Sequence, residues 1–127
     1  YVPSSVVFSV MWQESSFRNV TGDNNQSFGL MQVKERTAEL ILDRNFHGSG
    51  YKHDLIMNYR IAIEAGVAYL RSMYNRFGNP KKALRAYNAG PANWYYEDAN
   101  EYAKEVLVRS KDIEKEMIWR EIRINGW

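Results

Sequence analysis

One glutamate in the sequence stands where it could act as a general acid. Glu14 lies in the stretch WQESSF, residues 12–17, at the predicted C-terminal end of a helix. The negative end of the helix dipole opposes ionisation there, and burial would raise the carboxyl pKa further above its ordinary value of about 4.3. A glutamate that stays protonated near neutral pH can supply the proton for cleavage of a glycosidic bond. Position alone favours the simpler interpretation, a solvated glutamate at a helix end.

Two further segments carry side chains that could line a site beside this glutamate. The segment GDNNQSFGLMQV, residues 22–33, runs from polar turn formers into an apolar patch that contains one amide, Gln32. A turn that only connects two helices does not need such a patch. The segment AYNAG, residues 86–90, ends a predicted helix with an aromatic and an amide side by side. Both segments are candidates for the walls of a binding cleft.

The elements that position these residues are predicted to be helices. Ser4 and Ser5 can cap the first helix. Apolar residues in the segment 58–77 repeat every 3.6 positions, which predicts a buried central helix. The fold class expected is all-α, a single globular domain with at most a minimal β element near residues 22–33. The expected helices cover residues 4–15, 34–42, 58–77, 80–90 and 98–122, with a loop at 43–57.

Composition and charge exclude several classes of function. The chain has 127 residues, 45% of them hydrophobic, which fits one domain with a single core. Its 17 basic and 15 acidic residues are interspersed, and the net charge of +2 gives no strong attraction to nucleic acid. The absence of cysteine excludes disulfides, thiolate metal sites and a cysteine nucleophile. His47 and His53 lack partners at metal-ligand spacing, so no metal and no cofactor are expected.

No targeting or membrane-spanning segment is visible in the chain. No apolar run approaches the roughly 18 residues of a transmembrane helix. Tyr1 opens directly onto a helix-like stretch. We therefore expect residues 1–127 to be one domain cut from a longer protein, with any export signal or anchor outside the segment.

Six motifs along the chain resemble, in order, those of the soluble-type lytic transglycosylase domain, a family related to goose-type lysozyme. The motifs are Glu14-Ser15-x-Phe17, Gly29-Leu30-Met31-Gln32, Thr37-Ala38, Gly66-x-x-Tyr69-Leu70, Ala86-Tyr87-Asn88-Ala89-Gly90 and Tyr102. They cover nearly the whole chain, apart from residues 113–127. The resemblance implies a lysozyme-like fold and a lytic transglycosylase catalytic domain over residues 1–127.

The resemblance also implies an activity. Enzymes of this family cleave peptidoglycan between N-acetylmuramic acid and N-acetylglucosamine, and Glu14 would be the only catalytic carboxylate. Glu14 would protonate the leaving oxygen and then take the proton of the muramyl 6-hydroxyl as a 1,6-anhydro ring closes, while the substrate's own N-acetyl group stabilises the cationic centre. The partner expected is a peptidoglycan glycan strand. The domain is expected to be monomeric and to act in the bacterial periplasm, cell envelope or extracellular space, or in a phage.

Substrate-binding roles follow for residues in and around the motifs. Gly29 would let the backbone approach a sugar ring, Met31 would offer an apolar surface, and Gln32 would bind an N-acetyl or hydroxyl group. Tyr87 would stack on the reacting sugar or donate to it, and Asn88 would hold the adjoining backbone. For Gly29, Met31 and Tyr87, turn formation and core packing remain open as the alternative. The complete expected substrate-binding set is Ser15, Asp23, Ser27, Gly29, Met31, Gln32, Tyr87, Asn88, Asp98 and Tyr102.

Asp23 keeps a hydrolytic alternative open. Lytic transglycosylases often have a serine at this place, and some members carry a Gly-Asp-Asn variant like the one here. Goose-type lysozymes have an aspartate before a very similar Phe-Gly-Leu-Met-Gln-Val run, and they hydrolyse the bond. Asp23 could then activate a water molecule, as the base of an inverting enzyme does. The second acidic residue of the goose-type enzymes is Lys34 here, which favours the transglycosylase.

Other features bear on the site. Ala62 stands where the family commonly has asparagine, and Asp98 stands where several members have a glutamate that contacts the catalytic region. The aromatic run 94–96 suits either carbohydrate stacking or packing. A non-catalytic glycan-binding or assembly module is a further alternative, against which the intact Glu-Ser motif argues. A helical interaction domain using the charged segment 104–123 has only charge in its favour.

Overall fold

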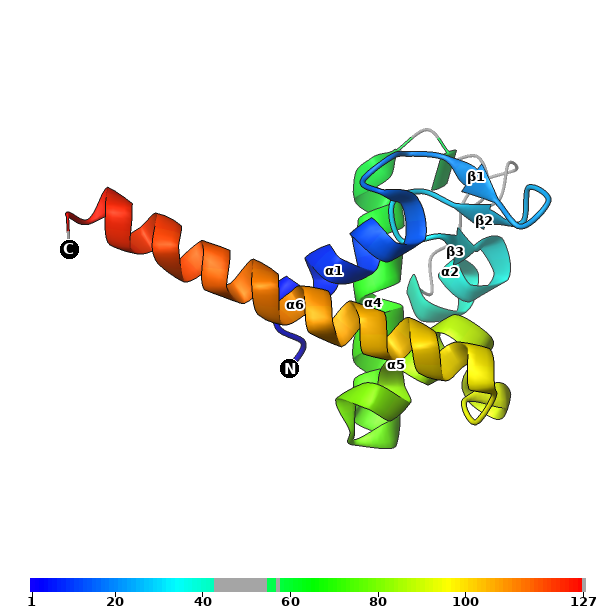
Figure 1. Ribbon diagram of the computed structural model, residues 1–127. Coiled ribbons are helices and arrows are strands. Elements are labelled where there is room, and N and C mark those ends of the chain that lie inside the picture. Colours follow the sequence, from blue (N-terminus) through cyan, green and yellow to red (C-terminus); the bar gives the residue numbers. More distant parts are fainter. Residues whose placement is uncertain (43–54, 57, 127) are drawn as a thin grey trace.

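The computed structural model describes residues 1–42, 55–56 and 58–126, and most of these residues lie in helices (Figure 1). The expected all-α class is confirmed. The expected loop at 43–57, with His47 and His53, lies outside the described residues except at positions 55 and 56, where Leu55 is buried in the core. The helices are α1 (Ser4–Ser15), α2 (Glu35–Leu42), α4 (Tyr59–Phe77), α5 (Pro80–Ala89) and α6 (Glu97–Ile124), with a 3-10 turn η1 (Pro91–Asn93) after α5.

The start of α1 differs from the expected serine cap. Ser4 and Ser5 lie inside the helix, and the N-cap position is occupied by Pro3, which makes no side-chain cap. The carbonyl of Pro3 accepts hydrogen bonds from the backbone of Val6 and Val7, at 3.0 and 3.2 Å. Proline has no N–H to satisfy and its φ is already close to the helical value, so it can precede a helix without a capping side chain.

The central helices are bounded by residues of the expected types. Asn58 caps α4 by accepting two backbone N–H groups, and Asn79 caps α5 in the same way with one. Gly78 ends α4 with φ at 65°, the left-handed conformation that glycine adopts without a steric penalty. Pro80 occupies the first turn of α5, where its missing N–H removes no helical hydrogen bond.

Three two-residue strands form a small antiparallel sheet, which confirms the minimal β element. The connection between the first two strands places Asp23, Asn24 and Asn25 at φ values of 50°, 56° and 66°. Aspartate and asparagine tolerate this left-handed region better than other side chains do. The polar half of GDNNQSFGLMQV is therefore a tight turn. The strands are β1 (Thr21–Gly22), β2 (Ser27–Phe28) and β3 (Val33–Lys34), in the order β1-β2-β3.

Small residues on α4 let the apolar half of that segment lie directly against the helix. A Cβ atom added to Gly66 would lie 2.7 Å from the Cβ of Met31, and one added to Gly29 would lie 2.7 Å from the Cβ of Ala62. Met31 and Ala62 are both fully buried. The GLMQ stretch therefore faces the central helix, and this packing fixes the backbone that connects β2 to β3.

Helix α6 crosses the domain and packs against α1 and α5 (Figure 1). The hydroxyl of Ser9 donates to the buried carbonyl of Val106 at 2.7 Å, and the Arg109 guanidinium donates to the Gln13 side chain at 2.8 Å. The buried residues of α6 end at Ser110, and its later turns extend away from the other helices (Figure 1). None of the helices in the described part of the chain, α6 included, has both the length and the hydropathy of a membrane span.

Candidate active site

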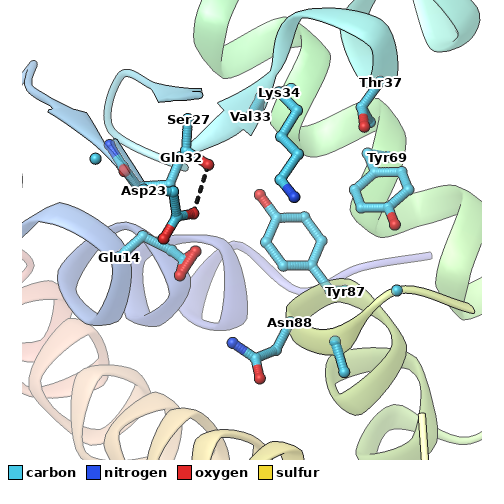
Figure 2. Close-up of a pocket in the computed structure, with 13 residues that line it drawn as sticks. Glu14, Asp23, Ser27, Gln32, Val33, Lys34, Thr37, Tyr69, Tyr87 and Asn88 are labelled. Carbon is cyan, nitrogen blue, oxygen red and sulfur yellow. Dashed lines mark hydrogen bonds between the residues drawn. The ribbon is translucent and has the colours of Figure 1, made fainter. Parts of the chain in front are cut away.

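A cleft of about 590 Å³ opens beside the last turn of α1 (Figure 2). Its walls come from α1, the small sheet, the start of α2, the middle of α4 and the end of α5, so segments far apart in the sequence meet there. Six of the residues expected from the sequence line this cleft. They are Glu14, Asp23, Ser27, Gln32, Tyr87 and Asn88.

Glu14 is the acid of the cleft. It projects from the last turn of α1 and is half-buried. Burial, and then the negative charge of Asp23, raise the pKa of the Glu14 carboxyl from 4.5 to about 8. Both effects disfavour the charged form, so the carboxyl is protonated at neutral pH and can donate a proton. A group that must give a proton and later take one back works best with a pKa near the working pH.

Asp23 lies across from Glu14 in the turn between β1 and β2 (Figure 2). Its side chain is exposed, and one carboxylate oxygen accepts a hydrogen bond from the hydroxyl of the buried Ser27 at 2.7 Å. This bond orients the carboxylate while it stays in contact with solvent. The negative charge of Asp23 at the cleft therefore raises the pKa of Glu14 beyond the effect of burial.

Tyr87 and Gln32 hold the backbone of the cleft wall. The Tyr87 hydroxyl donates to the Met31 carbonyl at 2.8 Å, across 56 positions of sequence. The Gln32 amide nitrogen donates to the carbonyls of Val20 and Gly29, both at 2.9 Å. The donor group of Gln32 is therefore already engaged within the protein. Binding of an N-acetyl or hydroxyl group by Gln32 would therefore use the amide oxygen as acceptor.

Three expected binding residues do not line the cleft. The Ser15 hydroxyl is buried and donates to the carbonyls of Met11 and Leu30, so it joins α1 to the GLMQ stretch. The backbone of Gly29 lies against Ala62 of α4 and not at the cleft, where a sugar ring was expected to approach it. Met31 packs against α4 with no exposed surface. The expectation that Gly29 and Met31 form a sugar-facing surface was wrong because their segment packs inward, which is the alternative that the sequence left open.

The two expected residues on α6 also lie outside the cleft lining. Asp98 is exposed in the first turn of that helix. Tyr102 is buried, and its hydroxyl has no hydrogen-bond partner within the described residues. Burial first, and then the charge of Glu14, raise the pKa of Tyr102 well above its ordinary value. Tyr102 is therefore a buried neighbour of Glu14 and has no surface in the cleft.

Asn88 and the aromatic run 94–96 differ from their expected roles. Asn88 is exposed at the cleft, and its side chain makes no hydrogen bond to the described residues, so it does not hold the adjoining backbone. Trp94 packs against Phe77, with ring centroids 6.3 Å apart, and lies 5.5 Å from the Arg85 guanidinium. The run 94–96 does not line the cleft. Packing, and not sugar stacking at this cleft, accounts for Trp94.

Seven residues that line the cleft were absent from the expected set: Gly22, Val33, Lys34, Thr37, Tyr69, Ala89 and Gly90. Tyr69 comes from α4 and packs on Tyr87, with ring centroids 5.2 Å apart. Thr37 and Tyr69 both belong to motifs that resemble the family, so the motif pattern could have identified them. Lys34 belongs to none of the six motifs, but its place at the second acid of goose-type lysozymes was a sequence signal for it, and the pairing of β3 with β2 sets it beside the cleft.

Comparison with known proteins identifies the family of this chain. A family model described as the transglycosylase SLT domain matches residues 1–108. The chain belongs to the transglycosylase SLT family. The resemblance of the six motifs is thereby confirmed, and the part of α6 that extends from the globule lies beyond the matched residues.

Solved structures of similar fold agree with this SLT assignment. The 70 kDa soluble lytic transglycosylase from Escherichia coli is 24% identical, with a TM-score of 0.71 over 87% of this chain. An inactive glutamate-to-glutamine mutant of the lytic transglycosylase Slt from Pseudomonas aeruginosa is 22% identical, with a TM-score of 0.73 over 91% of this chain. The SLT domain described here spans 21% and 22% of those two chains. The lysozyme-like helical fold is confirmed by these likenesses.

Proposed function

We propose that residues 1–127 are a peptidoglycan lytic transglycosylase domain. It would cleave the β-1,4 bond between N-acetylmuramic acid and N-acetylglucosamine without water and leave 1,6-anhydro-muramyl ends. The observation that carries the proposal is the half-buried Glu14, whose pKa is raised to about 8 inside a cleft of an SLT fold. Such a carboxyl can act first as acid and then as base.

The proposed reaction uses Glu14 twice. The protonated carboxyl donates to the glycosidic oxygen, and the bond from that oxygen to the muramyl anomeric carbon breaks. The carbonyl oxygen of the substrate's N-acetyl group stabilises the cationic centre. The Glu14 carboxylate then accepts the proton of the muramyl 6-hydroxyl as that oxygen bonds to the anomeric carbon. Glu14 ends protonated, ready for another turnover.

The surroundings of Glu14 support a one-carboxylate mechanism. Asp23 raises the pKa of Glu14, which favours the acid form at the start of the reaction. Tyr87 fixes the wall through its hydrogen bond to the Met31 carbonyl, and its ring packs on that of Tyr69. Lys34 occupies the place at which goose-type lysozymes carry a second acid, and it cannot act as a base while it is charged.

Hydrolysis is the second candidate, and the position of Asp23 favours it. The carboxylate is exposed at the cleft, held by Ser27, and could activate a water molecule on the far face of the sugar. The products would then carry reducing muramic acid. A glycan-binding module without turnover is the third candidate, and the raised pKa of Glu14 is a property that such a module would not need.

The partners proposed follow from this activity. The domain would meet glycan strands of peptidoglycan, as a monomer, in the bacterial periplasm, cell envelope or extracellular space, or as part of a phage. The longer protein proposed to contain it would supply the export route.

The test is digestion of purified peptidoglycan followed by mass analysis of the products. Wild-type protein and Glu14→Gln are compared, with Glu39→Gln on the exposed face of α2 as the matched control. We expect wild type and Glu39→Gln to release fragments one water lighter than those of a lysozyme, and Glu14→Gln to be slower by at least about 10²-fold. Reducing ends would support the hydrolase, and no release by the wild type would support the binding module.

A further inference from the structure

Lys34 places a basic side chain inside the candidate active site, and no carboxylate of the described residues pairs with it. It is the last residue of β3, its side chain is exposed, and among the described residues it is the only basic one that lines the cleft. Figure 2 shows its amine directed toward the ring of Tyr87. Among the described residues, no carboxylate forms an ion pair with it. Within the described part of the chain, nothing neutralises the amine, and it is exposed at the cleft where a charged ligand could meet it.

The two carboxyl groups of the cleft do not neutralise this amine. Asp23 is held by Ser27, on the Glu14 side of the cleft. Glu14 is neutral below about pH 8, because its pKa is raised by burial and by Asp23. Lys34 lies on the other side of Tyr87, near Thr37 (Figure 2). The cleft is thus divided into a proton-donating end and a cationic end.

A cationic end is not needed to bind the uncharged parts of a glycan. N-acetyl and hydroxyl groups are satisfied by neutral donors and acceptors such as Thr37 and Gln32. A lysine amine binds a carboxylate more strongly, because a charge-assisted hydrogen bond is worth about twice a neutral one. Peptidoglycan carries carboxylates on its peptide stems and, where a stem has been removed, on the lactyl group of muramic acid.

We propose that Lys34 binds a carboxylate of the glycan strand and so makes the cleft selective for acidic over neutral N-acetylated glycans. The inference rests on the proposed function, and it names the substrate group that one residue of the cleft recognises. The acid that goose-type lysozymes carry at the place of Lys34 could not bind a carboxylate, because two carboxylates repel each other.

The experiment measures glycan binding in the Glu14→Gln background, where turnover is suppressed. Three probes are compared: a tetramer of N-acetylglucosamine, a muramyl tetrasaccharide without stems, and the same tetrasaccharide with peptide stems. Lys34→Met keeps the length of the side chain and removes its charge. Lys81→Met is the matched control, since Lys81 is exposed at the start of α5 and does not line the cleft.

We expect Lys34→Met to weaken binding of the acidic probes by about fivefold to tenfold and to leave the neutral tetramer within about twofold. Loss confined to the stem-free probe identifies the lactyl carboxylate as the ligand, and loss confined to the other probe identifies the stem. Added salt should weaken the binding of the acidic probes more in the proteins that keep Lys34 than in those that carry Lys34→Met. Equal weakening of all three probes, no weakening, or no binding of any probe would overturn the inference.

A kinetic measurement separates this inference from the proposed function. Lys34→Met with Glu14 intact should raise KM for peptidoglycan about fivefold to tenfold with kcat nearly unchanged, because the contact exists in ground and transition states alike. The pH at which activity falls should not move. Failure of the wild type to cleave peptidoglycan would refute the function. Cleavage with an unchanged KM in Lys34→Met would refute the role of Lys34 alone.

Discussion

Replacing Glu14 with glutamine should change how the stability of the domain depends on pH. In the wild type, the carboxyl pKa is 4.5 when the chain is unfolded and about 8 when it is folded. The folded state therefore keeps its proton where the unfolded state has lost it. Stability contributed by this group is fully present below the lower pKa and is lost as pH rises toward the upper one. Glutamine is neutral at every pH and carries no such dependence.

The size of the effect follows from the distance between the two pKa values. Each factor of ten in proton affinity is worth about 1.4 kcal/mol, so the interval from 4.5 to about 8 corresponds to an upper limit of about 5 kcal/mol. Part of this loss occurs below about pH 5, and Glu14 is half-buried, so solvent reduces it further. We expect the wild type to lose about 2 to 4 kcal/mol relative to Glu14→Gln between about pH 5 and pH 8.5.

The assay is urea unfolding followed by tryptophan fluorescence at a series of pH values. The free energy of unfolding is extrapolated to water for the wild type, for Glu14→Gln and for Glu39→Gln. Groups that titrate alike in all three proteins cancel when the curves are subtracted. The difference between the wild type and Glu39→Gln should stay flat, because Glu39 is exposed.

A particular pair of curves would refute this reasoning. If the wild type and Glu14→Gln remain parallel from about pH 5 to pH 8.5, within about 0.5 kcal/mol, then the folded carboxyl has an ordinary pKa and is ionised at neutral pH. The acid step of the proposed mechanism would then lack its proton donor.

Three other results are expected. Asp23→Asn should lower the rate of peptidoglycan cleavage by about tenfold or less and leave the anhydro products unchanged, because a charge near Glu14 is lost but no base is removed. A drop of about a thousandfold together with reducing ends would favour hydrolysis. Gly66→Ala should lower stability by about 1 to 2 kcal/mol in urea unfolding, because the new Cβ meets Met31; a gain of about 1 kcal/mol, the helix preference alone, would show that the contact yields. Removing residues 114–127 should shift Tm by less than about 4 °C, as the buried residues of α6 end at Ser110, and a larger fall in a melting curve would reveal a contact of that segment with the globule.

The sequence by itself predicted most of the helices, the family and a candidate acid at a helix end. Apolar residues at a 3.6-residue period placed α4 correctly, because periodicity and the caps at Asn58 and Gly78 are local properties of the chain. The order of the motifs identified the SLT family, whose model matches residues 1–108. Glu14 could be singled out in the same way, from its place at a helix end within a Glu-Ser motif.

Tertiary structure alone decided which of the candidate residues face the cleft. Gly29 and Met31 turn inward because α4 presents Ala62 and Gly66 to them, a contact between segments that sequence spacing does not reveal. Lys34 reaches the cleft because β3 pairs with β2.

The acidity of Glu14 also depends on the fold. Its carboxyl is raised to a pKa of about 8 by burial and by Asp23, which lies in a different element of the structure. The helix end marks where such a group can stand, but desolvation and the position of a second charge are properties of the packed chain. Those two properties set the protonation state at neutral pH, and with it the chemistry that the site can perform.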